Sequence, residues 1–320
     1  MPEKGLFLQN VIAVIWDFDK TLSPQYMQKP LFDAYDVDEQ RFWAEVNALP
    51  AYYAKAGVTV QQDTSYLGHL LSYVQSGRMP DLTNARLREL GADIEFFPGI
   101  PELFERLANL ARISPFDEWD LHLEHYVVST GIAEMVRGSR IAPYLSGIHA
   151  SEFIEVPAGP GTDFAGSPQT GPISQIAGFL DNTTKTRALF EINKGVNKAG
   201  ISVNDAIPED ERRVPFKNMI YIADGPSDIP SFSVVKKHNG HTCAVYTPGS
   251  AKHFEQAKRL QDTDRVDHVA PADYREGTQV SMWLEAVVKE IAGRMVEERK
   301  RAFQSKVSPG PTHVTDEEKK

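Results

Sequence analysis

The chain has 320 residues, of which 41% are hydrophobic and 24% are charged, with a net charge of −10 and a pI near 5.4. The length is sufficient for one large domain or two, and the proportions of hydrophobic and charged residues are typical of a globular protein. The acidic balance, without a basic cluster, argues against general nucleic-acid binding. The single cysteine, Cys243, excludes an intrachain disulfide and any site built from several cysteines.

No stretch of the sequence approaches the roughly 18 apolar residues that a membrane-spanning helix needs. The apolar residues near the N-terminus are too few for a signal peptide and run directly into acidic residues. We therefore expect no membrane partner and a cytoplasmic location.

In chain order, the first predicted element is a strand at residues 11–16, where six apolar residues follow one another. Helical patterns at residues 38–47, 65–76 and 82–90 follow, with Asp38 and Thr83 as candidate N-caps. Asp17 and Ser129 are 112 residues apart, far more than a simple crossover between strands needs. The sequence therefore predicts an inserted helical cap.

The second part of the chain alternates between predicted strands and helices, which is typical of a parallel sheet. The predicted helices span residues 102–110 and 280–303, and the predicted strands end near residues 128, 154, 222, 246 and 269. We expect a doubly wound, Rossmann-like α/β fold of at least five strands. The predicted core comprises residues 1–22 and 97–304, and the predicted cap comprises residues 23–96. We expect residues 305–320 to form a disordered tail. A Gly/Pro-rich loop at 155–182 and a charged insert at 193–215 have no assigned role.

Polar residues follow several of these strands at the point where each strand ends. Asp17 and Asp19 follow the first strand, Ser129 and Thr130 follow Val127-Val128, and the run Asp224-Gly225-Pro226-Ser227-Asp228 follows the strand 219–222. Lys185 lies near the start of a helical pattern between the last two of these. Because open parallel sheets bind ligands at the carboxyl ends of their strands, we expect these side chains to meet.

These residues resemble the four motifs of the haloacid dehalogenase superfamily, and within it the phosphatases that look like phosphoserine phosphatase. The motifs are D-x-D-x-T, a Ser or Thr after an apolar strand, a Lys, and a D-G-x-x-D pair, and all four occur here in the family's order between residues 17 and 228. The resemblance implies a phosphomonoesterase that acts on a small phosphorylated metabolite.

The resemblance also implies a role for each residue. Asp17 would be the nucleophile and would form an aspartyl-phosphate, and Asp19 would act as general acid and then as general base. Mg²⁺ would be held by Asp17, Asp224 and the backbone carbonyl of Asp19. Asp228 would hold a metal-bound water or orient Lys185. Ser129, Thr130 and Lys185 would bind the phosphoryl group.

Alternatives remain at this stage. A phosphomutase would use the same residues, and a non-catalytic regulatory module could keep the fold. Asp17 and Asp19 could instead form turns, and Ser129 and Thr130 could cap a helix at residues 132–136. The oligomeric state is open. Basic residues of the cap that could bind a carboxylate or a second phosphate of the substrate are Lys29, Arg41, Arg78, Arg86 and Arg88.

Overall fold

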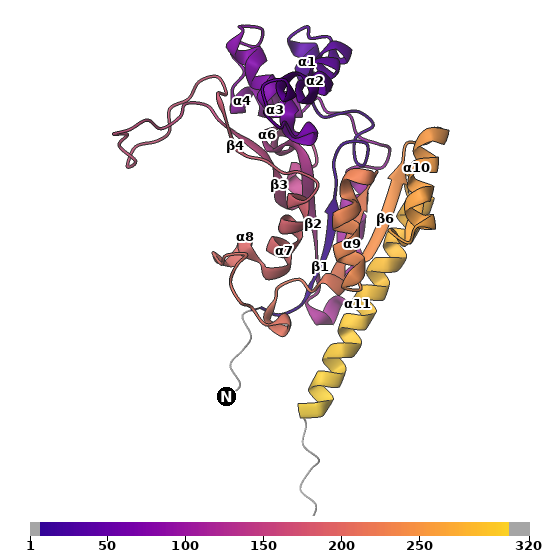
Figure 1. Ribbon diagram of the computed structural model, residues 1–320. Helices are drawn as coiled ribbons and strands as arrows, with labels where there is room; N and C mark the ends of the chain where they lie inside the picture. The colour runs from indigo at the N-terminus through magenta and orange to yellow at the C-terminus, as the bar shows by residue number, and fades with distance from the viewer. Residues whose placement is uncertain (1–6, 307–320) are drawn as a thin grey trace, which may run out of the picture.

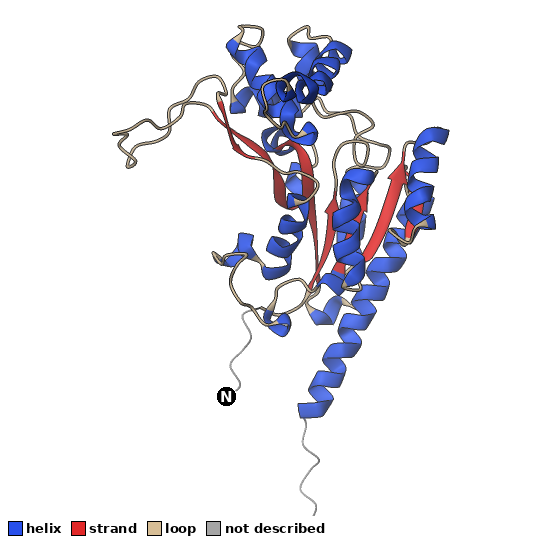
Figure 2. Ribbon diagram, in the orientation of Figure 1, coloured by secondary structure: helices blue, strands red, loops and turns tan. Residues whose placement is uncertain are grey.

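A seven-stranded sheet forms the centre of the protein in the computed structural model, which describes residues 7–306. The strand order is β4-β3-β2-β1-β5-β6-β7, and every neighbouring pair is parallel except β3 and β4. The strands are β1 (Val11–Trp16), β2 (His122–Ile132), β3 (Leu145–Ile154), β4 (Gln175–Gly178), β5 (Met219–Ala223), β6 (His241–Tyr246) and β7 (His268–Pro271). The predicted mainly parallel α/β fold is confirmed (Figure 2).

Strand β1 is central and buried on both faces, as its continuous apolar sequence predicts. Ile12, Val14 and Trp16 belong to one hydrophobic core, together with side chains of α5 (Glu102–Leu110) and α11 (Gln279–Lys306). The alternate residues Val11, Ala13 and Ile15 belong to a second core on the other face of the sheet. That core includes side chains of α7 (Thr184–Lys194), α9 (Ile229–Lys237) and α10 (Ala251–Asp262).

Four helices lie between β1 and α5, above the carboxyl ends of the strands (Figure 1). They are α1 (Lys29–Ala34), α2 (Glu39–Ala54), α3 (Gln62–Gln75) and α4 (Asn84–Gly91). The N-caps predicted for α2 and α4 are confirmed, because Asp38 accepts from the amide of Arg41 and Thr83 from the amide of Arg86. We propose that these helices form the cap, within the predicted bounds 23–96.

The remaining short helices are α6 (Ala133–Gly138) and α8 (Val196–Ala199). The loop from residue 155 to residue 174 joins the antiparallel strands β3 and β4 and projects away from the sheet (Figure 1). Part of it packs under the cap, since Ile173 is buried and its amide donates to the carbonyl of Leu82.

Several sequence-based boundaries were wrong; for example, α2 was predicted to end at residue 47 but ends at Ala54. Helix α11 extends to Lys306 and includes the first two residues of the predicted disordered tail; residues 307–320 of that tail lie outside the described part of the chain. Strand β2 does not end at Val128 but continues to Ile132. Among the described residues, no helix has the length and apolar character needed to cross a membrane.

Candidate active site

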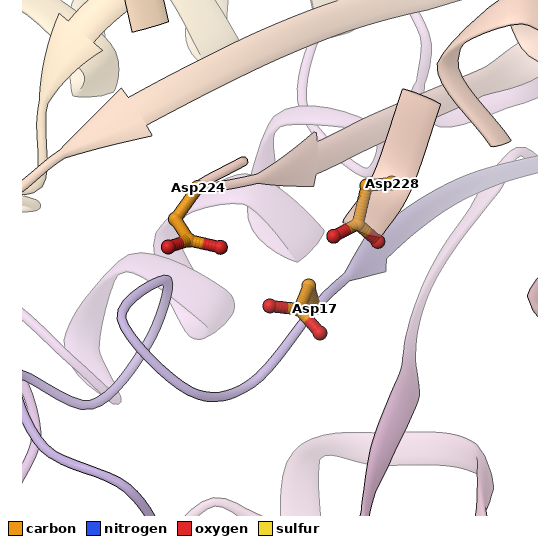
Figure 3. A group of neighbouring side chains, drawn as sticks. All are labelled: Asp17, Asp224 and Asp228. Carbon is orange, nitrogen blue, oxygen red and sulfur yellow. The ribbon is translucent and has the colours of Figure 1, made fainter. Parts of the chain in front are cut away.

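The predicted site residues meet at the carboxyl ends of β1 and β5. Asp17 directly follows β1 and Asp224 directly follows β5, while Asp228 ends a single turn of 3₁₀-helix before α9. Carboxylate oxygens of the three residues all lie within 4.8 Å of one another. Figure 3 shows the three side chains converging on one space. Asp17 and Asp228 are buried.

Lys185 connects two of these carboxylates. Its ammonium group donates to Oδ1 of Asp17 at 2.8 Å and to Oδ1 of Asp228 at 2.7 Å. The side chain is only 1% exposed, which places a full positive charge in the interior. Burial opposes this charge, but the carboxylates of Asp17 and Asp228 outweigh it and hold the pKa of Lys185 well above its usual value.

The carboxylates carry more charge than Lys185 can balance. Burial raises the pKa of Asp17 to about 6 despite the nearby Lys185 ammonium. Burial, and to a smaller extent repulsion from the carboxylate of Asp17, raises the pKa of Asp224 well above its usual value. Three carboxylates and one ammonium would together carry a net negative charge, which is costly to bury without a further cation. The donor set, carboxylate oxygens only, is the type that Mg²⁺ prefers.

Asp228 has little capacity left for a metal ion. Its Oδ1 accepts from Lys185 and from the phenol of Tyr221 at 2.6 Å, and its Oδ2 accepts from the hydroxyl of Ser227 at 2.7 Å. Asp17 by contrast accepts from Thr21 at Oδ2, at 3.1 Å, and from Lys185 at Oδ1. These contacts favour Asp17 and Asp224 as the residues that could hold a metal ion, with Asp228 positioning Lys185.

Asp19 lies beside this cluster but in a different environment. Its Oδ1 accepts from the backbone amide of Met27 at 2.8 Å. Burial, together with the charge of Asp17, raises the pKa of Asp19 to about 7. A carboxyl group with this pKa can release and take up a proton near neutral pH.

A bulge in β2 presents Ser129 and Thr130. Val128 pairs with His149 and Ile132 pairs with Ser151, so three residues of β2 lie opposite one residue of β3. The hydroxyl oxygen of Ser129 accepts from the amide of Gly131 at 3.0 Å, which leaves its own proton free to donate. The alternative that Ser129 and Thr130 cap a helix is wrong, because α6 begins after Ile132 without a side-chain cap.

Met27 and Gly131 contribute to the site and were missed by sequence reasoning. A Cβ atom on Gly131 would lie 2.2 Å from Cε of Met27, so a larger residue there would displace the end of the Met27 side chain. The sulfur of Met27 also accepts from the amide of Ile132 at 3.1 Å. Met27 thereby links the cap side of the site to the bulge, a contact between residues about a hundred positions apart that carries no local sequence signal.

The basic cap residues considered for substrate binding are engaged elsewhere. Four of them form ion pairs, Lys29 with Asp33, Arg41 with Glu45, Arg86 with Glu89 and Arg88 with Glu134, while Arg78 lies over the ring of Tyr73. A cavity of about 360 Å³ is bordered by Asp19, Thr130 and Gly131, and none of these five basic residues contributes to its lining. A cavity of similar size, about 380 Å³, is lined by Asn193, Phe216 and Lys217 and includes no motif residue.

Comparison with known proteins gives one sequence relative and several distant structures. No protein-family model matches the chain. An uncharacterized protein of Borreliella burgdorferi is 38% identical over 282 residues, which cover 86% of this chain and 96% of the relative. A family relationship with that protein is shown at this identity and coverage.

The solved structures are similar at low identity. A haloacid dehalogenase family hydrolase of Salmonella enterica is 12% identical with a TM-score of 0.47, over 82% of this chain and 67% of that one. A probable phosphoserine phosphatase of Vibrio cholerae, in unliganded form, is 14% identical with a TM-score of 0.48, over 91% and 68%. A phospho-aspartyl intermediate analogue of phosphoserine phosphatase is 16% identical with a TM-score of 0.45, over 81% and 93%.

Proposed function

The chain belongs to one family with the Borreliella burgdorferi protein and has the α/β fold that its motifs predict for the haloacid dehalogenase superfamily, and we propose that it is a Mg²⁺-dependent phosphomonoesterase. The substrate is a small phosphorylated metabolite, and the reaction passes through an aspartyl-phosphate on Asp17. The observation that carries the proposal is the buried ion-pair cluster in which Lys185 bonds to both Asp17 and Asp228 beside Asp224. Buried acids in such a group are costly in a purely structural role.

Asp17, Asp224 and the backbone carbonyl of Asp19 would hold Mg²⁺. When bound, the ion supplies positive charge that offsets the repulsion between the phosphate ester and the carboxylates. The excess negative charge of the three carboxylates over Lys185 supports this assignment.

In the first step, a carboxylate oxygen of Asp17 forms a bond to phosphorus and the ester P–O bond breaks. Thr21 and Lys185 hold the Asp17 carboxylate in place through its two oxygens. Asp19 gives its proton to the departing alcohol oxygen. Its raised pKa, about 7, keeps a large fraction of Asp19 protonated for this step near neutral pH.

In the second step, Asp19 accepts a proton from water, whose oxygen attacks phosphorus and releases Asp17. One residue thus acts first as acid and then as base, and the hydrogen bond from the Met27 amide fixes its orientation for both. The Ser129 hydroxyl and the backbone amide of Thr130 would donate hydrogen bonds to the phosphoryl oxygens.

Phosphate release tests the proposal. The substrates are p-nitrophenyl phosphate and a panel of metabolite phosphates, with and without Mg²⁺, for the wild type and for Asp17→Asn. We expect turnover that requires Mg²⁺ and falls at least about a thousandfold in the variant, because the nucleophile is lost. Asp38→Asn is a matched control, since it makes the same change at the exposed N-cap of α2, where asparagine also caps well.

Failure of the wild type to release phosphate from any substrate would contradict the proposal. A phosphomutase would be recognised by transfer of the phosphoryl group to a second hydroxyl without net release of inorganic phosphate.

A further inference from the structure

The cavity beside Asp19 lies where the leaving group of the substrate would be held. Its volume is about 360 Å³, and it is bordered by Asp19, Thr130 and Gly131 on the sheet side and by cap residues on the other. Because Asp19 would protonate the departing alcohol, the part of the substrate attached to that oxygen must occupy this cavity. Its lining therefore selects the alcohol.

Aromatic side chains form one wall of the cavity. Tyr26, Trp43 and Tyr66 all line it, and the ring of Trp43 lies 5.1 Å from that of Tyr26 and 5.8 Å from that of Tyr66, between centroids. Tyr66 is fixed by donating its hydroxyl to the carbonyl of Thr130 at 2.8 Å. Such rings attract a cation through their faces.

The charges around the cavity are negative. Asp63 of α3 lines it, as does Asp19, while none of its lining residues in the described chain is Lys, Arg or His. A basic group near the aromatic wall is Lys20. Its ammonium lies 4.9 Å from the centroid of the Tyr26 ring and donates to the carbonyl of Pro24. Lys20 borders a separate small pocket with Asp224. No described residue that lines the cavity would supply a counter-charge to a second acidic group on the leaving group.

Two buried polar atoms of the lining have no partner among the described residues. They are Oε1 of Gln28, a side chain only 3% exposed, and the indole Nε1 of Trp43. A buried acceptor without a donor is destabilising unless a ligand satisfies it. Oε1 of Gln28 can accept from an N–H or O–H group of a ligand that reaches it, and the Trp43 indole can donate to a ligand oxygen.

We propose that the cavity binds a leaving group with a protonated amine and no second acidic group, so that the substrate is the phosphate monoester of a small amino alcohol. This inference rests on the proposed phosphatase function. The ammonium group would lie against the aromatic wall, donate to Gln28 Oε1 and face the carboxylate of Asp63. An alcohol with a carboxylate or a second phosphate would be rejected, because its charge would lie next to the carboxylates of Asp19 and Asp63, with no cation among the described residues that line the cavity.

The test compares four phosphate esters of similar size. Phosphoethanolamine carries the amine alone, phosphoserine the amine and a carboxylate, phosphoglycolate the carboxylate alone, and ethyl phosphate neither. We expect kcat/KM for phosphoethanolamine to exceed that for ethyl phosphate about tenfold or more, since a charge-assisted hydrogen bond and a cation–π contact are both gained. Phosphoserine and phosphoglycolate should be poorer substrates than ethyl phosphate.

Asp63→Asn isolates the contribution of the negative charge. The ratio of kcat/KM between phosphoethanolamine and ethyl phosphate should fall about tenfold in this variant. Oδ2 of Asp63 also accepts from the side-chain amide Nδ2 of Asn182 at 2.7 Å, a contact between α3 and the segment before α7. Asn182→Ala is therefore the matched control, because it removes that hydrogen bond and leaves the carboxylate; its ratio should equal that of the wild type.

Each outcome decides the inference. Equal or better turnover of phosphoserine, phosphoglycolate or ethyl phosphate would overturn it while leaving the phosphatase function intact. So would an equal fall of the ratio in Asn182→Ala, which would show that the hydrogen bond and not the charge matters. Absence of Mg²⁺-dependent turnover for all four esters and for p-nitrophenyl phosphate would instead overturn the proposed function.

Discussion

Lys185 shows how a single residue joins sequence motifs that are far apart. It lies 168 positions from Asp17 and 43 from Asp228, yet bonds to both. A sequence pattern alone predicts a lysine near the start of a helix, and most such lysines lie at the surface. Its burial follows from the carboxylates that surround it, since each buried charge here is tolerated only because the others are present.

His125 is a buried titratable residue outside the proposed chemistry. Its Nδ1 accepts from the indole of Trp16 and its Nε2 donates to the carbonyl of Phe104, both at 3.1 Å. Burial lowers the pKa of His125 to about 4, against a smaller opposing effect of the Phe104 carbonyl. The imidazole is therefore neutral in the folded protein near neutral pH.

This pKa predicts a loss of stability in mild acid. Between its unfolded pKa, about 6.5, and about 4, the unfolded state binds a proton that the folded state does not, so the free energy of unfolding decreases as the pH falls. The decrease due to His125 should total about 3 kcal/mol by pH 4. Urea unfolding at pH 7, 5.5 and 4 measures it.

In His125→Gln this part of the pH dependence should disappear, although the variant is less stable at pH 7. The exposed His122→Gln provides the control and should keep the wild-type dependence. Identical slopes for wild type and His125→Gln would contradict the assignment.

At the scale of elements, α4 of the proposed cap packs directly on α6 of the core. A Cβ on Gly138 at the end of α6 would lie 1.7 Å from the carbonyl oxygen of Arg88, and one on Gly91 would lie 2.2 Å from that of Met135. Each helix thus places a glycine against the backbone of the other. Arg88 and Glu134 add an ion pair across the same contact. The proposed cap therefore packs on the core through the contact between α4 and α6.

Gly138→Ala should push these helices apart. Because the Cβ would meet backbone and not a movable side chain, we expect a loss of about 1–3 kcal/mol in the free energy of unfolding. Phosphatase activity should fall as well, since α6 directly follows the β2 bulge. Urea unfolding and kcat/KM measure the two effects.

Gly293→Ala in α11 is the control for this substitution. No atom lies within 4 Å of its Cβ position, so alanine should stabilise the helix by about 0.5–1 kcal/mol. Wild-type stability in Gly138→Ala would show that α4 and α6 do not pack as described.

Elements and motif residues were predictable for the same physical reason. A short apolar run that ends in Asp predicts a buried strand with a carboxylate at the edge of the sheet. The runs that form β1 and β5 therefore allowed the positions of Asp17 and Asp224 to be predicted from the sequence. Capping residues located the starts of α2 and α4. The bulge in β2 was not predictable, because it depends on how β3 pairs beside it.

At the scale of the whole molecule, the helices of the proposed cap lie above the carboxyl ends of the strands (Figure 1). Residues of these helices line the cavity that contains Asp19. Which cap residues face the cavity was beyond sequence reasoning. Gln28, Trp43 and Asp63 come from separate elements, and their convergence depends on how these helices pack. Four of the five basic residues that seemed suitable for binding substrate instead form ion pairs within the proposed cap or with α6. The acidic charge of the chain, −10, agrees with a substrate whose leaving group is not anionic.

The central claim is that Asp17 becomes phosphorylated, and trapping the phosphoenzyme tests it most directly. Asp19→Asn should still form the intermediate with a substrate whose leaving group needs no proton, such as p-nitrophenyl phosphate, but should lack the base that hydrolyses it. After an acid quench, mass spectrometry of the peptide containing Asp17 should show the added mass of one phosphoryl group, dependent on Mg²⁺ and absent from Asp17→Asn/Asp19→Asn. A phosphoryl group on another residue, or phosphate release by Asp17→Asn at the wild-type rate, would contradict the account.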